Sequence, residues 1–153
     1  MNFIKTLLCA AVLAVVAIPT ANAQLSLGAG IAYGTDISEI GIQARGMYQF
    51  NETWRGSLDF IYFLDGVEGF SFFELNPNAH YIFSDSGQAV FYAIGGLTIA
   101  FATVDFGPFG GSQSDSDIGL NIGAGTTIDL GGIQGQAEVK YTLGGFEQLV
   151  LSA

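Results

Sequence analysis

The sequence is short of positive charge: Lys and Arg number 4 against 14 Asp and Glu, which gives a net charge of −10. A nucleic-acid-binding domain needs a basic face, and so few cations do not provide one. The single cysteine, Cys9, excludes a disulfide scaffold. Charged residues of both signs make up only 12% of the chain, against roughly 25% in an ordinary soluble domain. The few charges must therefore occupy selected positions.

Proline is also scarce, at 3 residues, whereas glycine numbers 22, hydrophobic residues make up 50% and aromatic residues 13% of the chain. A disordered chain does not hold so many aromatic residues. After residue 23 there is no hydrophobic run long enough to cross a bilayer as a helix, which needs about 20 residues. The apolar residues fall at alternate positions instead, and this alternation decides the fold class.

The first 23 residues have the layout of a secretory signal peptide. Lys5 supplies the positive start, residues 6–19 form an apolar core, and Ala21 to Ala23 make a small-x-small cleavage site. We expect cleavage after Ala23, which removes Cys9, and export through the general secretory pathway. The mature domain is then expected to cover residues 24–153.

Residues 117–130 show the alternation clearly, because the even positions are apolar or Thr and the odd positions are Gly, Asn, Thr or Asp. A period of two indicates a β-strand rather than a helix. Runs of this kind, separated by turn residues such as Gly131-Gly132, predict eight strands at residues 25–33, 40–50, 54–64, 73–83, 89–104, 117–130, 133–143 and 146–153. In the run 89–104 both the even and the odd positions are apolar, so the sequence does not show which of these side chains face the lumen. Residues 105–116 are predicted to form the one large loop, and Pro77 predicts a bulge or an irregular strand.

The two faces of the predicted strands point to a membrane barrel. The basic residues that follow residue 23 all lie on the polar face, while the apolar face carries aromatic residues near the strand ends. Two aromatic girdles around an apolar band are typical of transmembrane β-barrels. The expected girdles are Tyr48, Phe50, Trp54, Tyr81 and Phe83 at one end, and Tyr33, Tyr62, Phe72 or Phe73, and Tyr141 at the other. The alternative is a soluble β-sandwich, whose outer face would need many more Lys and Glu.

An eight-stranded barrel has an interior that side chains fill. The polar faces of the strands therefore predict a lumen network made of Arg45, Arg55, Asp59, Glu74, His80, Glu138 and Lys140. Unpaired charges are costly in such a place, so we expect the cations and the carboxylates to pair.

Three stretches carry a resemblance to a known family: Trp54-Arg55 with Asp59 to Phe63; Leu75 to Phe83, followed by Tyr92 and Gly95 to Leu97; and Gly119 to Gly125 running into Ala137 to Tyr141. They resemble small outer-membrane β-barrel proteins of the OmpA/OmpX/OmpW type, especially those of Bacteroidetes-like bacteria. The resemblance implies an all-β, eight-stranded, antiparallel, up-and-down transmembrane β-barrel of the broad porin family in a Gram-negative cell outer membrane. It also implies insertion by the barrel-assembly machinery.

The end of the chain departs from that family, whose last strand closes on a terminal aromatic residue that serves in assembly. This chain stops at Leu151-Ser152-Ala153. The resemblance favours a truncated last strand that lacks an alternating Gly/aromatic ending. The alternative is a natural protein with a short closing strand.

The sequence offers little for catalysis. Its only histidine, His80, would be the general base in an outer-membrane barrel lipase or deacylase, but it falls on the lumen side beside Asn78. We therefore expect His80 to belong to the lumen network and the protein not to be an enzyme. His and Cys show no metal-ligand spacing, and the Gly-rich stretches are mid-strand, so no cofactor and no resident metal are expected.

The loops expected outside the cell carry no Lys or Arg, but seven acidic residues: Asp36, Glu39, Asp65, Glu68, Asp105, Asp115 and Asp117. The last three form a candidate cation-binding rim that would bridge to lipopolysaccharide phosphates. The alternative is an acidic rim that is simply solvated.

Together these features predict an integral outer-membrane protein with a plugged lumen and a structural role in envelope integrity. Its expected partners are outer-membrane lipid and lipopolysaccharide, and it is expected to be a monomer that binds no nucleic acid. A surface binding or adhesion protein stays an alternative because the loop 105–116 is large enough to touch a partner. A narrow small-solute channel is the other, if paired charges do not block the lumen.

Overall fold

The computed structural model of the protein describes residues 24–64 and 68–153. The predicted signal peptide, residues 1–23, and Asp65 of the predicted acidic loops lie outside the described residues. Within the described part, no helix is long and apolar enough to cross a membrane.

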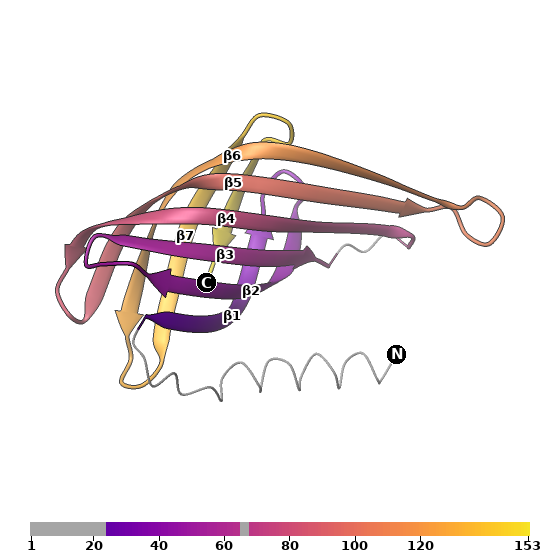
Figure 1. Ribbon diagram of the computed structural model, residues 1–153. Helices are drawn as coiled ribbons and strands as arrows, with labels where there is room; N and C mark the ends of the chain where they lie inside the picture. The colour runs from indigo at the N-terminus through magenta and orange to yellow at the C-terminus, as the bar shows by residue number, and fades with distance from the viewer. Residues whose placement is uncertain (1–23, 65–67) are drawn as a thin grey trace.

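Eight antiparallel strands form a closed barrel in which each strand pairs with its neighbours in the chain and β8 pairs with β1 (Figure 1). The strands are β1 (Leu25–Gly34), β2 (Glu39–Gln49), β3 (Trp54–Phe63), β4 (Phe70–Asp85), β5 (Ala89–Asp105), β6 (Ser112–Asp129), β7 (Gln134–Leu143) and β8 (Gln148–Ser152). The predicted eight-stranded up-and-down barrel is confirmed. We call the end that holds Gln24 and the turns near residues 51, 87 and 131 the terminal end, and the opposite end the loop end.

Local sequence explains the tight turns of the terminal end. Between β6 and β7, Gly131 and Gly132 have φ angles of 84° and 108°, a region that residues with a side chain rarely adopt. Asp129 Oδ1 accepts a hydrogen bond from the Gly131 N–H at 2.9 Å, and the Leu130 N–H donates to Ile133 O at 2.9 Å. These bonds reverse the chain and set the register of the two strands.

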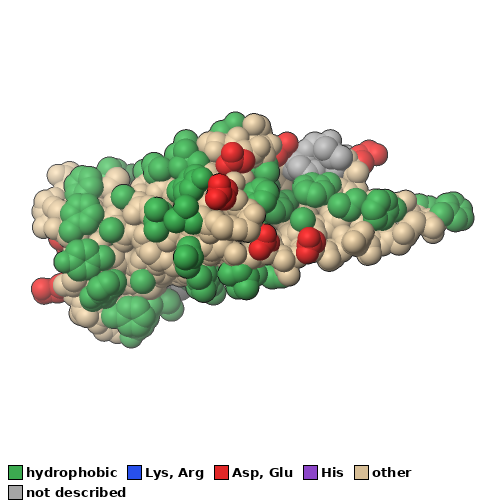
Figure 2. Space-filling model, turned by 90° about the horizontal axis from the view of Figure 1, so that it is seen from above, with side chains coloured by type: hydrophobic (Ala, Val, Ile, Leu, Met, Phe, Trp, Pro, Cys, Tyr) green, Lys and Arg blue, Asp and Glu red, His purple; other side chains and the backbone are tan. Residues whose placement is uncertain are grey.

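The alternation places apolar side chains outside the barrel and polar side chains inside it. Leu58 and Ile122 are each 52% exposed on the outer surface, whereas their chain neighbours Asp59 and Asn121 are 0% and 1% exposed. Figure 2 shows hydrophobic side chains spread over the outer surface and no Lys or Arg on the face in view. A surface of this kind suits hydrocarbon rather than water.

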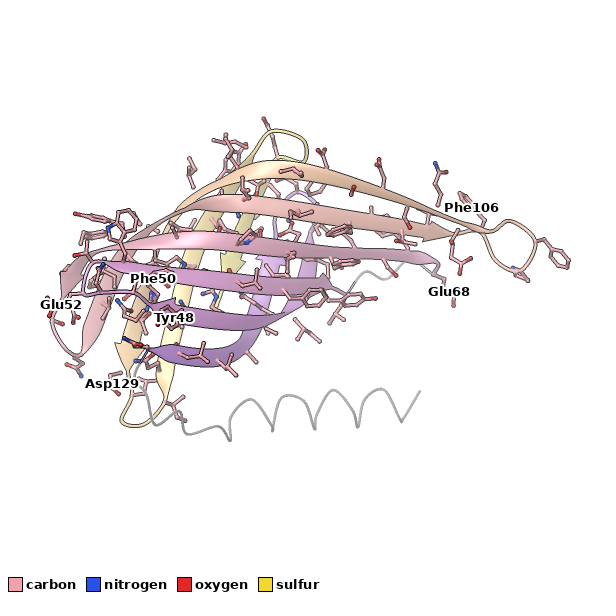
Figure 3. All side chains as sticks on the ribbon, in the orientation of Figure 1. Tyr48, Phe50, Glu52, Glu68, Phe106 and Asp129 are labelled. Atoms are coloured by element: carbon pink, nitrogen blue, oxygen red, sulfur yellow. The ribbon has the colours of Figure 1, made fainter. Side chains whose placement is uncertain are left out.

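Aromatic side chains lie outside near both ends, as the girdles require. Figure 3 shows Tyr48 and Phe50 at the terminal end, close to the turn that carries Glu52, and the Tyr48 and Phe50 rings are 5.1 Å apart. Near the loop end, the sequence left the choice between Phe72 and Phe73 open. The structure places Phe73 outside, stacked on Phe101 at 4.8 Å, and buries Phe72 inside.

Strands β4, β5 and β6 have 16, 17 and 18 residues, and they extend beyond the other strands at the loop end (Figure 1). The predicted loop at 105–116 is therefore shorter than expected and covers residues 106–111, because β5 continues to Asp105, which pairs with Ser112. Cross-strand contacts such as Thr103 Oγ1 to Ser114 Oγ at 3.1 Å hold this extension, although Ser, Gln and Asp have low β-propensity. We call residues 100–119 the arm; its β6 part has no partner in β7.

Pro77 interrupts the ladder with β5, because neither Asn76 nor Pro77 pairs with that strand, whereas the change of register in β4 occurs further on, between Ile82 and Ser84. The register with β5 is the same on both sides of Pro77 and places Leu97 opposite it. Proline has no N–H to donate to the Leu97 carbonyl, which the ladder turns toward β4. Asn121 Nδ2 donates to this carbonyl at 2.8 Å. A side chain from β6 thus replaces the missing backbone bond.

The shortest strand, β8, joins the two edges of the sheet. It pairs with residues 138–142 of β7 and 32–34 of β1, and the Ile31 and Ala153 backbones exchange hydrogen bonds of 2.8 and 2.9 Å. Toward the terminal end, residues 25–30 of β1 and 134–137 of β7 have no partner in β8. We call this opening the seam. A continuation of the strand past Ala153 stays a prediction.

Candidate functional site

Apolar side chains close the lumen at its loop end. This apolar plug consists of Ala32, Ile61, Phe63, Phe72, Ala100 and Val150. The Phe63 and Phe72 rings are 5.4 Å apart, and Phe146 of the β7–β8 connection packs on Phe72 at 5.1 Å. The plug is not among the features predicted from the sequence, although Ile61 and Phe63 share the parity of the lumen residue Asp59.

Arg45 is the centre of a buried ion cluster next along the lumen. Its Nε and Nη2 atoms donate to the two oxygens of Asp59 at 2.6 and 2.7 Å, and Nη2 also donates to Glu138 Oε2 at 2.5 Å. The bidentate arrangement with Asp59 matches the planar fork of a guanidinium to a carboxylate. The cluster links β2, β3 and β7 through the interior, and the predicted pairing is present for Arg45.

Glu138 extends the cluster to β5. Tyr92 Oη donates to Glu138 Oε1 at 2.7 Å, and Gln136 Nε2 donates to Tyr92 Oη at 2.6 Å. Gly125 provides the space, because a Cβ there would lie 2.7 Å from both Tyr92 Oη and Glu138 Cγ. Tyr92 was not predicted, since residues 89–104 are apolar at both parities and gave no facing.

His80 and Arg55 lie on the same tyrosine. The His80 ring stacks on Tyr92 at 4.5 Å, and Arg55 Cζ lies 4.5 Å from the Tyr92 ring centre. Arg55 Nε is 3.3 Å from His80 Nδ1, and Ser57 Oγ is 3.2 Å from His80 Nε2. Because an Arg donor occupies Nδ1, we assign the ring hydrogen to Nε2, which donates to Ser57. Both ring nitrogens have partners, and neither is offered to a substrate.

The lumen holds three cations and three carboxylates, and half of these six groups take part in an ion pair between a Lys or Arg and a carboxylate. In the described part of the chain, Arg45 is the one Lys or Arg with a carboxylate oxygen within 4.0 Å. The expectation of pairing therefore does not hold for Arg55 and Lys140. The reason lies in the register, which places His80 and Gln49 beside Arg55, and Gly123 and Val150 beside Lys140.

Glu74, the third lumen carboxylate, is held by amides instead of a cation. Asn76 Nδ2 and Gln148 Nε2 donate to it at 3.3 and 3.1 Å. Its side chain is fully buried below the apolar plug. These bonds connect β4 to β8 through the interior of the barrel.

A neutral layer of amides and hydroxyls surrounds Asn121. Asn121 Nδ2 donates to Asn78 Oδ1 at 3.0 Å, and Thr142 Oγ1 donates to Asn121 Oδ1 at 2.9 Å. The Thr98 hydroxyl bonds to Asn121 and Asn76. The layer joins β4, β5, β6 and β7, and all of its members are buried.

The terminal end of the lumen is hollow. A cavity of about 1670 Å³ reaches from Arg45 and Arg55 to the turns of that end, and residues 24–30 beside the seam line it. Acidic residues stand at its mouth, among them Glu52 and Asp129, which Figure 3 shows at this end. The lumen is thus filled from the loop end to its middle and empty beyond.

The structure does not gather Asp105, Asp115 and Asp117 into one site. Asp105 ends β5, where its Oδ1 accepts the Gly107 N–H at 2.9 Å, whereas Asp115 lies further along β6, opposite Ala102. Among the residues that the structure describes, no group of three or more His, Cys, Asp or Glu is placed to hold a metal ion. The predicted cation-binding rim is corrected accordingly: the continuing ladder keeps its members apart.

A closed eight-stranded barrel with an apolar outside, aromatic ends and a polar interior that side chains close at one end is the architecture of the small outer-membrane β-barrels. Solved structures agree with this class. The chain is similar to the N-terminal β-barrel domain of Pseudomonas aeruginosa OprF, with a TM-score of 0.67 and 15% identity over 84% of this chain and 92% of that one.

It is also similar to Ail, the attachment invasion locus protein of Yersinia pestis (TM-score 0.58, 21% identity, 84% of this chain and 91% of that one). A third similar structure is Neisserial surface protein A (TM-score 0.59, 20% identity, 84% and 90%). No protein-family model and no curated protein matches the chain. The resemblance to small outer-membrane barrels is confirmed at the level of fold, and the link to Bacteroidetes-like bacteria stays a prediction.

Proposed function

We propose that the protein is an integral protein of the cell outer membrane, exported through the general secretory pathway, with a structural role in envelope integrity. The observation that carries this proposal is the reversal of faces, with Leu58 and Ile122 half exposed outside while Asp59 and Asn121 are buried inside. Ail, one of the similar barrels, is described as an outer membrane protein. This location implies lipid, lipopolysaccharide and the barrel-assembly machinery as partners, for a protein that acts as a monomer.

Membrane fractionation tests the location. The folded barrel is expected to run at a different position on gels of unboiled and boiled samples, and to stay with the membrane pellet after a urea wash. A boiled aliquot of the same preparation is the control for the gel shift. Recovery in the soluble periplasmic fraction would overturn the proposal.

The proposed role includes a lumen that does not conduct, and no catalytic activity. The apolar plug and the Arg45 cluster support the first point, since they fill successive levels of the interior. The names of the similar barrels describe no enzyme activity, which agrees with the second. In planar lipid bilayers we expect no stable single-channel conductance, and steady current steps would contradict a closed lumen.

Surface attachment is a second candidate function, and the tip of the arm favours it. Phe109 is fully exposed and Phe106 is 61% exposed at the tip (Figure 3 labels Phe106). Aromatic residues are enriched at the contact points of protein interfaces, so a tip that carries two of them suits contact with another surface. Cells that display the Phe106→Ser/Phe109→Ser variant are expected to adhere less to an apolar surface than the wild type. The arm variant Gln113→Ser is the matched control, and equal adherence of all three would remove this candidate.

A further inference from the structure

We propose that the loop end binds a cationic, partly apolar peptide segment of another protein, in a cleft at the base of the arm. The proposal rests on the proposed function, because it takes the loop end to face the outside of the cell. The cleft has a volume of about 190 Å³. It lies where β4, β5 and β6 rise past the rest of the barrel (Figure 1), between these strands and the β1–β2 and β7–β8 connections.

The floor and sides of the cleft are apolar. Phe70 and Ala102 line it from β4 and β5, and Ile37 and Phe146 line it from the connections at the loop end. All four pack on the margin of the apolar plug and are only partly buried. An apolar side chain or the methylene stem of a long one is therefore the part of a ligand that this floor suits.

Two carboxylates stand beside the apolar floor. Asp115 and Asp117 have the lumen parity of β6, and both line the cleft. One oxygen of each accepts a neighbouring backbone N–H: Ser116 donates to Asp115 at 2.9 Å and Ile118 donates to Asp117 at 2.8 Å. In the described residues, no Lys, Arg or His lies within 4.0 Å of either carboxylate. Within the described part of the chain, the second oxygen of each accepts no hydrogen bond and can accept one from a ligand.

Among the residues that the structure describes, none supplies a cation for these carboxylates. The described cations, Arg45, Arg55 and Lys140, are all buried in the lumen, whereas the described charges of the loop end are acidic, such as Glu68 (Figure 3). Charge complementarity therefore calls for a positive partner. A Lys or Arg side chain meets both requirements, because its stem is apolar and its head is cationic.

The same bonds argue against a partner that adds a strand to the arm. The free edge of β6 would offer the Ser116 and Ile118 N–H groups to such a strand, but Asp115 and Asp117 already occupy them. Acidic side chains that cover edge donors are a known way to prevent strand addition. The recognition is thus expected to use side chains and not main-chain pairing.

The test measures fluorescence anisotropy of a short labelled peptide of alternating lysine and leucine, with the full chain in nanodiscs of zwitterionic lipid and empty nanodiscs as the blank. The Asp115→Asn/Asp117→Asn variant keeps both N–H acceptors and loses both charges. We expect it to bind at least about tenfold more weakly than the wild type. Asp85→Asn/Asp129→Asn, at the terminal end, removes the same charge and is expected to stay within about a factor of two.

Two further peptides test the chemistry of the cleft. Alternating glutamate and leucine is expected not to bind, and alternating lysine and serine is expected to bind at least about tenfold more weakly than lysine and leucine. The proposal is overturned if the wild type binds either control peptide as tightly as it binds the lysine and leucine peptide. It is also overturned if the Asp115→Asn/Asp117→Asn variant binds the lysine and leucine peptide as tightly as the wild type does. The gel shift of the same samples shows whether the barrel is folded. A folded, membrane-bound barrel that ignores the peptide refutes only this inference, whereas a soluble protein refutes the proposed function.

Discussion

Arg45 Nη2 donates a hydrogen bond of 2.5 Å to Glu138 Oε2, although 93 residues separate the two in the chain. Their strands, β2 and β7, are not neighbours in the barrel. The bond therefore crosses the interior and holds two walls together that share no backbone ladder. The same guanidinium also donates two hydrogen bonds to Asp59, so one cation serves two buried carboxylates.

The two lumen arginines are expected to respond differently to replacement. Arg45→Met leaves Asp59 and Glu138 buried without their cation, so it is expected to destabilise the barrel by about 3–5 kcal/mol. Arg55→Met removes a buried cation that has no carboxylate within 4.0 Å, and it is expected to change stability by less than about 1.5 kcal/mol. Urea unfolding in detergent, followed by tryptophan fluorescence, measures both. Equal losses would contradict the assigned cluster.

Two lumen glycines form a matched pair for testing the tight site at Tyr92. Gly125→Ala puts a Cβ 2.7 Å from Tyr92 Oη, so it is expected to cost about 1–3 kcal/mol through overpacking. At Gly28 a Cβ meets nothing within 4 Å, and Gly28→Ala is expected to be neutral or to gain up to about 1 kcal/mol. Urea unfolding in detergent, followed by tryptophan fluorescence, measures the change in stability of both variants. A larger loss at Gly28 than at Gly125 would refute this packing.

The outer face is tested by an arginine scan of two exposed apolar positions. Leu58→Arg places a charge at mid-strand and is expected to cost about 2–4 kcal/mol in a bilayer, whereas Phe50→Arg, in the terminal girdle, is expected to cost about 0–1 kcal/mol. Refolding into phospholipid vesicles at graded urea concentrations gives both values. If the two substitutions are equally harmless, the outer face does not meet hydrocarbon.

The replacement of a backbone bond at Pro77 makes a double-mutant cycle informative. Asn121→Ala leaves the Leu97 carbonyl without its donor and is expected to cost about 1–3 kcal/mol. In a Pro77→Ala background, the new N–H can bond to that carbonyl, so Asn121→Ala is expected to cost less there by about 0.5–1.5 kcal/mol. Additive losses would show that Asn121 does not substitute for the missing N–H.

The fold was predictable because alternation is a local signal. The apolar and polar parities of residues 117–130 and 133–143 assigned a face to each residue, and with it the lumen charges Glu138 and Lys140. Turn residues such as Gly131-Gly132 marked the strand ends. The alternation could not show which lumen side chains bond to one another. Arg45 bonds to Glu138 across the interior, whereas Lys140 has no carboxylate oxygen within 4.0 Å.

The β6 part of the arm, the plug residue Ala100 and the cluster residue Tyr92 could not be predicted from their own segments. Ser112 to Ser116 read as a loop because their composition is polar, and only pairing with β5 makes them a strand. Ala100 and Tyr92 lie in a run that is apolar at both parities, so the sequence assigned them no face. In both cases the missing information is the neighbouring strand and not the segment itself.

The contact between β8 and β1 also sets the order in which this chain can fold. Residues 150–152 must pair with residues 32–34, which lie at the other end of the described chain. Such a distant pairing forms slowly, because nearly the whole chain has to be ordered first. Until then the sheet is open, and its two unpaired edges and its apolar outer face favour aggregation. The chain is therefore most prone to aggregate after its hairpins have formed and before β1 pairs with β8.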